Sequence, residues 1–382
     1  MDNQLEMLFR RTFPVLICVC ALLAGGAVAA SAKSTTFVLR GAGFGHGIGM
    51  SQYGAYGQAR EGRNYKTILR TYFTGTTIEK ANKNTIRVIL RLGPSSMTFN
   101  GATAAGDVEL AASKRYRVRR NGGRVQLLSG RKVLASTTGK VVVTGKAIKL
   151  NGRAINGLAN GRYRQSIEFS ASDLGGLAAV NALDLDSYVQ GVVPGEIPSS
   201  WHEEALKAQS VAARSYALTT DAGGALFDQW PDTRSQVYKG IAVETARTNR
   251  AVQDTAGLVV MSGNRVATTY FFSTSGGQTE NIDKIWNSKS IAYLKSVKDP
   301  WDKISPYHRW TVRFSRAQLQ SKLRPWVRGQ LRDVRVIERG VSPRVVRARV
   351  VGTRGSKTIK GTELRTRLGL RDTWVSFKRV KR

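Results

Sequence analysis

Residues 183–218 read LDLDSYVQGVVPGEIPSSWHEEALKAQSVAARSYAL and carry most of the fold information in this 382-residue chain. Ser200 followed three residues later by Glu203 is the pattern of a capping box, which predicts a helix over about 201–220. The apolar face of this helix consists largely of alanine, which allows neighbouring backbone to approach closely. We therefore expect a buried, Ala-rich helix at the centre of the fold.

Glu196 stands between two prolines just before this helix. Pro194 and Pro198 fix φ and remove backbone donors, which predicts a stiff, non-helical loop that presents the carboxylate. The adjacent Val193 and Ile197 are apolar, and burial among such side chains raises a carboxyl pKa toward the range that a general acid needs. The plainer alternative, from composition alone, is a solvated surface glutamate.

The same stretch contains further charged residues. Lys207 and Arg214 are seven residues apart on one helix face, so they are candidates for binding an anionic ligand. The alternative is that they are surface charges whose stems lie along apolar neighbours. Asp184 and Asp186 alternate with leucines, which predicts the solvated face of a strand.

The regions on either side differ in their patterns. Residues 81–180 contain short alternating runs separated by Gly and Asn, typical of a β-rich module. Residues 33–80 begin with a glycine-rich segment and continue into a short helical pattern. Within 181–382, the residues from 311 onward hold 21 Lys and Arg against 4 Asp and Glu, and their apolar spacing predicts a folded part with a basic outer face. The sequence thus predicts a mixed α+β fold, with a strand-rich body, the Ala-rich helix and an inserted β-rich module.

The first 32 residues have the pattern of a signal peptide. Arg10 and Arg11 precede an apolar run over 13–23, and Ala30-Ser31-Ala32 fits a cleavage site. A retained anchor is the alternative, although the run is short for a membrane span. Both cysteines lie in this run. We therefore expect a secreted, extracytoplasmic protein of the cell wall that lacks cysteine once processed.

The charge of the chain points to an anionic partner. Its 60 Lys and Arg against 26 Asp and Glu give a formal net charge of +34, and such a balance favours association with polyanions. For an exported protein these are anionic wall polymers, and we expect no nucleic-acid partner. Contact with the membrane is expected only through an uncleaved signal segment.

Familiar catalytic motifs are incomplete in this chain. A zinc-protease helix requires a second His where Leu206 stands, and neither a nucleophile elbow nor a phosphate-binding loop is present. Three histidines in all, and no cysteine after processing, argue against a structural zinc site. We expect neither a cofactor nor a metal.

The quoted stretch resembles the stage II sporulation protein D / LytB amidase-enhancer family. The resemblance rests on its G-V-V-x-G-E-x-P and A-L-K-A-Q-x-V-A-A-R-x-Y-A elements, and it continues in consistent order through 232–238, 271–277, 293–302 and 361–374. It covers nearly the whole mature chain.

A glycine-rich segment departs from the order of the family. GFGHGIGMSQYG, residues 43–54, resembles a piece that follows the L-G-L-R-[SD]-T element of the sporulation members, whereas here it precedes everything else. Such a rearrangement is tolerated where chain ends lie close together. We therefore expect residues 36–80 to pack against residues 361–377.

The resemblance implies cleavage of peptidoglycan glycan strands. Some members act as lytic transglycosylases that prefer strands stripped of stem peptides, and the family's catalytic glutamate in G-E-x-P matches Glu196, which would be the single general acid and base. An ordinary hydrolase would need a second carboxylate, for which Asp184, Asp186 and Asp232 are the nearby candidates. The alternative function is that of a non-catalytic, wall-binding protein that recruits or enhances an N-acetylmuramoyl-L-alanine amidase.

Further residues are candidates for substrate binding. Gln236 and Tyr238 would line a sugar groove by hydrogen bonding and stacking, or else make buried structural hydrogen bonds. For His46 a buried structural role is the plainer alternative. The remaining candidates are small or polar residues of the two motif segments: Ser51, Gln52, Ser273, Ser275 and Gly277. Some relatives bind zinc through His and Cys in the stretch that matches residues 272–275. This chain has Phe272 and Ser275 there, and this departure argues against a metal role.

Overall fold

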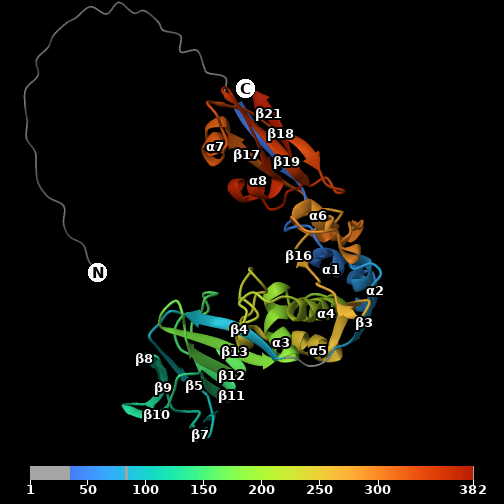
Figure 1. Cartoon of the computed structure of the whole chain (residues 1–382). Coiled ribbons are helices and arrows are strands. Elements are labelled where there is room, and N and C mark those ends of the chain that lie inside the picture. Colours follow the sequence, from blue (N-terminus) through green and yellow to red (C-terminus); the bar gives the residue numbers. More distant parts are fainter. Residues whose placement is uncertain (1–34, 82–84, 382) are drawn as a thin grey trace, which may run out of the picture.

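The computed structural model describes residues 35–81 and 85–381. The predicted signal peptide and both cysteines lie outside the described residues. Figure 1 shows a β-rich part, a central helical part and a C-terminal part that follow one another in space, with the first strand placed in the C-terminal part. This arrangement confirms the predicted mixed, strand-rich α+β class.

The β-rich part is a sheet of ten strands. Its main path has the order β10-β9-β8-β5-β11-β12-β13-β4, and β6 and β7 pair beside β11. Because β13 pairs with β4, the strands between them form an excursion that leaves the central part and returns to it. The bounds are β4 (Thr85–Leu92), β5 (Ser96–Asn100), β6 (Ala104–Ala105), β7 (Val108–Glu109), β8 (Tyr116–Asn121), β9 (Arg124–Ser129), β10 (Lys132–Thr137), β11 (Val141–Leu150), β12 (Arg162–Ala171) and β13 (Leu177–Asp184).

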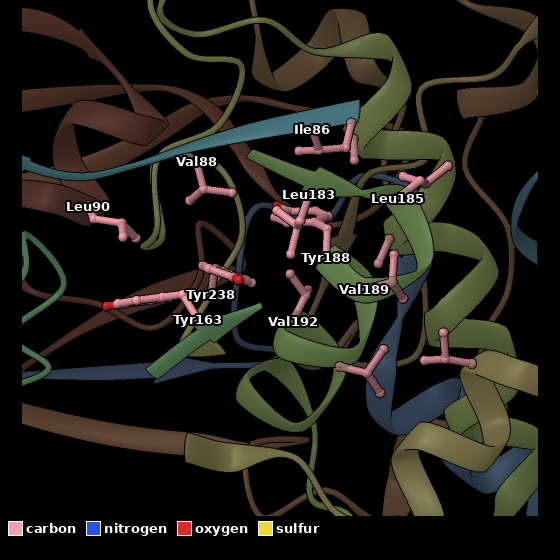
Figure 2. Packing of buried hydrophobic residues seen from close by; sticks show 14 of the residues in the cluster. Ile86, Val88, Leu90, Tyr163, Leu183, Leu185, Tyr188, Val189, Val192 and Tyr238 are labelled. Atoms are coloured by element: carbon pink, nitrogen blue, oxygen red, sulfur yellow. The ribbon is translucent and has the colours of Figure 1, made fainter. Parts of the chain in front are cut away.

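The central part packs helices against the β13 end of this sheet. Figure 2 shows Val189 and Val192 of a central helix close to Leu183 of β13, with Tyr163 and Tyr238 beside them. These side chains belong to one apolar core that continues from the sheet into the helices. The elements are β2 (Met50–Ser51), α1 (Gln52–Arg60), α2 (Tyr65–Tyr72), β3 (Thr77–Lys80), α3 (Leu185–Glu196), α4 (Glu203–Thr219), η1 (Gly240–Val243), α5 (Ala246–Asp254), β14 (Leu258–Ser262), β15 (Arg265–Val266), β16 (Phe271–Phe272), α6 (Ile282–Ile285), η2 (Ala292–Leu294) and η3 (Pro300–Ile304).

Helix α4 is the predicted buried, Ala-rich helix, but its cap differs from the prediction. The helix begins at Glu203, and the Nδ1 atom of His202 accepts the N–H of Glu204 at 3.3 Å. The proposed capping box of Ser200 and Glu203 is therefore wrong. A histidine ring in its neutral form accepts a hydrogen bond as a serine hydroxyl would.

Helix α3 also departs from the expectations. Glu196 is its last residue, and Pro194 lies inside its final turn, where a proline removes only one hydrogen bond of the helix. The carboxylate is thus held by a helix end and not by a non-helical loop. Asp184 caps the same helix by accepting the N–H of Ser187 at 2.9 Å, so it does not lie on a solvated strand face.

The C-terminal part has a second apolar core of its own. It contains β17 (Trp310–Ser315), α7 (Arg316–Lys322), β18 (Leu331–Arg339), β19 (Val345–Gly352), β20 (Gly355–Lys360), α8 (Gly361–Leu368) and β21 (Val375–Lys381). Strand β1 (Thr35–Gly41) lies between β17 and β21 and pairs with both. The backbone of Ala42 then donates to the carbonyl of Trp374 at 3.0 Å, so the glycine-rich segment follows directly from this sheet. Within the described ranges, no helix is both long and apolar enough to cross a membrane.

A buried arginine joins the C-terminal part to the central part. Arg344 makes two hydrogen bonds of 2.9 Å to the carboxylate of Asp372, and neither side chain is exposed. The same guanidinium donates to the carbonyls of Gln278 at 2.7 Å and Ser275 at 2.8 Å. We call this group the Arg344 clamp. It abuts Gly47 of the glycine-rich segment so closely that a Cβ there would lie 2.4 Å from the Arg344 Nε atom.

We expect Arg344→Met to lower the free energy of unfolding by about 3–5 kcal/mol, because it leaves the Asp372 carboxylate buried without its partner. Urea unfolding followed by circular dichroism measures this loss. Arg347→Met is the matched control: Arg347 forms an exposed pair with Glu338, and such pairs contribute about 0–1 kcal/mol. Equal unfolding midpoints for the two variants would contradict the clamp.

Candidate active site

A pocket of about 500 Å³ contains Glu196. Its walls come from the glycine-rich segment, the start of α1, the ends of α3 and α4, the loop after Pro231, strand β16 and helix α8. The lining residues are Phe44, Gly45, His46, Gln52, Glu196, Tyr216, Thr233, Arg234, Ser235, Tyr270, Phe271, Phe272, Ser273 and Arg365. Segments that are far apart in the sequence thus meet at one carboxylate.

The carboxylate of Glu196 is held by the backbone of the neighbouring loop. Its Oε1 atom accepts the N–H of Val237 at 2.6 Å. The loop can come this close because α3 has a glycine where the two touch: a Cβ on Gly195 would lie 2.7 Å from the carbonyl oxygen of Val237. Only a residue without a side chain permits this approach.

Glu196 is partly buried, and this burial raises its pKa to about 7 from an ordinary value of 4.5. The hydrogen bond from Val237 acts in the opposite direction and lowers the pKa, but by less than burial raises it. A water-poor site disfavours the charged form of a carboxyl group. Near neutral pH the group is therefore divided between its acid and its base forms, which suits a residue that gives and then takes a proton.

His46 lies on the wall of the pocket, but both of its ring nitrogens are engaged. Nδ1 accepts the N–H of Ile48 at 3.1 Å, and Nε2 donates to the carbonyl of Phe271 at the same distance. Burial, followed by the charge of Arg365, lowers its pKa to about 3, so the ring is neutral. The imidazole thus fixes the glycine-rich segment to β16.

Aromatic rings make up much of the remaining wall. Tyr216 of α4 meets Tyr270 edge to face, with ring centroids 5.9 Å apart, and Phe44 meets Tyr307 in the same way at 5.1 Å. Rings of this kind offer apolar faces together with hydroxyl groups, as in sites that bind small polar molecules.

Two arginines line the pocket and differ in their partners. The guanidinium of Arg234 pairs with both oxygens of Asp232, at 2.8 and 2.6 Å, and stacks on Trp230 at 3.6 Å from the ring centroid. Asp232 is thereby occupied, and its pairing with Arg234 lowers its pKa. Arg365 has no acidic partner within 4 Å among residues 35–81 and 85–381.

The two predicted ligand-binding cations of α4 are engaged elsewhere. Lys207 pairs with Glu203 at 2.5 Å and also lies within 4 Å of Glu204 and Asp254. Arg214 is fully buried, pairs with Asp186 at 2.7 Å and donates to three backbone carbonyls. Neither residue lines the pocket, so the structure gives both a role inside the fold in place of the predicted ligand contact.

The predicted residues of the loop and turn segments divide into two groups. Gln52 and Ser273 line the pocket with Glu196 and His46. The others lie behind its walls: Gln236 accepts from the hydroxyl of Tyr188, Tyr238 donates to Asn181, Ser51 caps α1, and Ser275 accepts the N–H of Gly277. These four hydrogen bonds hold the wall segments in place.

The sequence did not identify several lining residues as site residues. Thr233, Arg234 and Ser235 lie within the 232–238 motif, Tyr216 within the helix motif, and Arg365 within the 361–374 motif. Their position within these motifs was the only feature of the sequence that could have marked them as site residues. Helix periodicity assigned Tyr216 to an apolar face, and nothing local shows that α8 reaches the pocket.

Comparison with known proteins gives consistent matches. Residues 173–261 match the SpoIID family, described as stage II sporulation protein. This range contains Glu196 and the loop that holds it. The chain is 36% identical over 221 residues to the stage II sporulation protein D of Bacillus subtilis (strain 168), covering 53% of this chain and 62% of that protein.

Residues 173–261 thus form a SpoIID region, and the chain is similar to stage II sporulation protein D and to an amidase enhancer. The stage II sporulation protein D of Bacillus amyloliquefaciens matches to the same extent, with 36% identity over 62% of its length. A protein of Bacillus subtilis (strain 168) named amidase enhancer is 40% identical over 135 residues, which are 35% of this chain and 18% of that protein. The chain thus spans about three fifths of the length of the two sporulation proteins.

The raised pKa of Glu196 predicts a cost in stability that depends on pH. Because the folded pKa of about 7 exceeds the ordinary 4.5, folding takes up a proton between these values, and the free energy of unfolding falls as pH rises through this window. Above pH 7 the cost is on the order of 3 kcal/mol. Glu196→Gln keeps an acceptor for Val237 and removes the cost, so we expect the variant to be more stable than the wild type at pH 8.

Urea unfolding at pH 4 and pH 8 measures this difference. The gain of Glu196→Gln should be present at pH 8 and absent at pH 4. Glu109→Gln is the matched control, because Glu109 lies exposed on β7, and it should not show a gain confined to high pH. A Glu196→Gln protein with the same stability difference at both pH values would show that the carboxylate is not buried as described.

Proposed function

We propose that this protein cleaves peptidoglycan glycan strands as a lytic transglycosylase, with Glu196 as the single general acid and base. The observation that carries the proposal is one carboxyl group with a pKa near 7, held by backbone in a pocket walled by aromatic rings. The match of residues 173–261 to the SpoIID family and the resemblance to the SpoIID/LytB family support the same substrate class.

The pocket favours a non-hydrolytic cut because its described lining contains a single acid. The other nearby carboxylates are occupied: Asp184 caps α3, Asp186 pairs with Arg214, and Asp232 pairs with Arg234. A hydrolase of the ordinary kind uses two carboxyl groups. A single group suffices where the substrate supplies its own nucleophile.

The reaction proceeds in two proton transfers. Protonated Glu196 donates its proton to the glycosidic oxygen, the bond from that oxygen to C1 of the N-acetylmuramyl ring breaks, and positive charge develops at C1. The carboxylate of Glu196 then takes the proton of the C6 hydroxyl of the same ring, and O6 bonds to C1. The products are a new 4-hydroxyl end and a 1,6-anhydromuramyl end, and Glu196 returns to its acid form without consuming water.

We place this activity outside the cytoplasm, because the first 32 residues have the pattern of an export signal and the chain carries a net charge of +34. Its partners are peptidoglycan strands and anionic wall polymers, which attract the basic C-terminal part.

A second candidate function is stimulation of a cell-wall amidase without glycan cleavage. The observation in its favour is the match of 135 residues to a protein named amidase enhancer. In that case the pocket would bind glycan while a partner amidase performs the chemistry.

We expect purified full-length protein to release fragments with 1,6-anhydromuramyl ends from glycan strands, and Glu196→Gln to lower the rate by about 10²–10⁴-fold, because general acid and base catalysis is lost. Mass spectrometry of the fragments measures both. The wild-type rate should fall above pH 7 as the acid form is lost.

Glu109→Gln is the control that removes a surface carboxylate and should cleave at the wild-type rate. If neither wild type nor Glu196→Gln releases fragments, while both bind strands and accelerate a cell-wall amidase equally, the enhancer function replaces the lytic one.

A further inference from the structure

Arg365 is a pocket cation that lacks an acidic partner in the described part of the chain. It lies on α8 of the C-terminal part and is half-buried, with burial lowering its pKa. Its Nε atom makes one long hydrogen bond of 3.4 Å to the carbonyl of Leu370. The side chain has no other hydrogen bond within the described ranges, so most of the five guanidinium donors remain available.

Nearby charges do not neutralise Arg365. Asp372 is the acid that most favours its charged form, but both oxygens of Asp372 are bound to Arg344. The positive charge of Arg344 also acts on Arg365 and lowers its pKa. The effect reaches the pocket wall, where Arg365 contributes to the low pKa of His46.

Glu196 is a poor partner for this cation. A guanidinium close to a carboxylate lowers its pKa, whereas the pKa of Glu196 is raised, with burial as the leading cause. The pocket therefore contains a carboxyl group able to hold a proton, and a different lining residue supplies unbalanced positive charge. A partly dehydrated guanidinium with free donors favours a carboxylate, which it can bind through two hydrogen bonds.

The anion must then come from the ligand. If the proposed function holds, on which this inference rests, the ring that is cleaved at C1 is N-acetylmuramic acid, which carries a lactyl ether at C3. The lactyl group ends in a free carboxylate when no stem peptide is attached and in a neutral amide when one is. It is the anionic group of a peptide-free strand nearest to the reacting carbon.

We infer that Arg365 binds the free lactyl carboxylate of the muramyl residue whose glycosidic bond lies at Glu196. Arg365 is thus a specificity-determining residue, and through it the C-terminal part contributes to substrate selection. It distinguishes a carboxylate from an amide at the same position of the sugar.

The test compares two substrates that differ only at the lactyl group, which is a carboxylate in one and a neutral amide in the other. One is a preparation of peptide-free glycan strands, and the other is the same preparation with its lactyl carboxylates coupled to methylamine. Wild type should cleave the carboxylate strands with a kcat/KM about 10- to 100-fold higher than the methylamide strands, the range expected for a charge-assisted hydrogen-bonded pair. Arg365→Gln should lose this preference, because its kcat/KM on the carboxylate strands should fall toward its own value on the methylamide strands.

Two further variants serve as controls. Arg365→Lys keeps the charge without the planar fork and should retain part of the preference. Arg324→Gln removes an exposed arginine from the same C-terminal part and should retain all of it. Thermal unfolding of each variant checks that the fold is unchanged.

Binding to the Glu196→Gln protein separates this inference from the proposed function. Dissociation constants for the two strand preparations, with and without Arg365→Gln, need no turnover. Loss of the preference in binding supports the Arg365 site even if the wild type cleaves neither preparation, in which case the lytic function alone fails. An unchanged preference in Arg365→Gln, in cleavage or in binding, overturns the Arg365 site and leaves the lytic function standing.

Discussion

The Arg344 clamp is the interaction on which the rest of this structure depends. Two apolar cores lie in different parts of the chain, and the clamp joins them at a point where no apolar side chain could satisfy the backbone carbonyls of Gln278 and Ser275. The glycine-rich segment passes against it, with Gly43 and Gly47 in positive-φ conformations that side chains rarely adopt. Because this segment carries Phe44 and His46, the clamp sets one wall of the pocket.

Glu196 contrasts with the charged pair of the Arg344 clamp, because the fold keeps this carboxyl group in a position that favours its neutral form. The close contact of Gly195 with Val237 brings a single N–H to the carboxylate, and aromatic side chains make up much of the surrounding wall. The residues that stabilise the fold and those that hold the acid are therefore different. This separation allows the site to carry a cost in stability that burial of the two apolar cores offsets elsewhere.

The sequence predicts local structure and family better than it predicts the site. Regular apolar spacing was sufficient for α2 and α4, and the motif around Glu196 was sufficient for the family. Helix α3 was missed and the cap of α4 was misassigned, because Asp184 and His202 act through local hydrogen bonds that leave no periodic pattern. Helix spacing placed Lys207 and Arg214 on one face, but it could not show that acids from α3 and α5 are within reach of them.

The long-range part of the site could not be read from the sequence. Arg365 and Glu196 are 169 positions apart in the sequence. Arg365 reaches the pocket only because α8 packs in the C-terminal part and the Arg344 clamp fixes that part to the central one. A contact of this kind depends on tertiary packing and leaves no local signal.

Glu196 is buried in a water-poor pocket, and this burial brings its pKa close to neutral pH. Carbon-13 NMR titration of protein labelled at the glutamate side-chain carboxyl carbons, with the signal of Glu196 assigned by its absence in Glu196→Gln, measures this directly. The structure predicts a titration midpoint of about 7. A midpoint near 4.5, the ordinary value for glutamate, would contradict it.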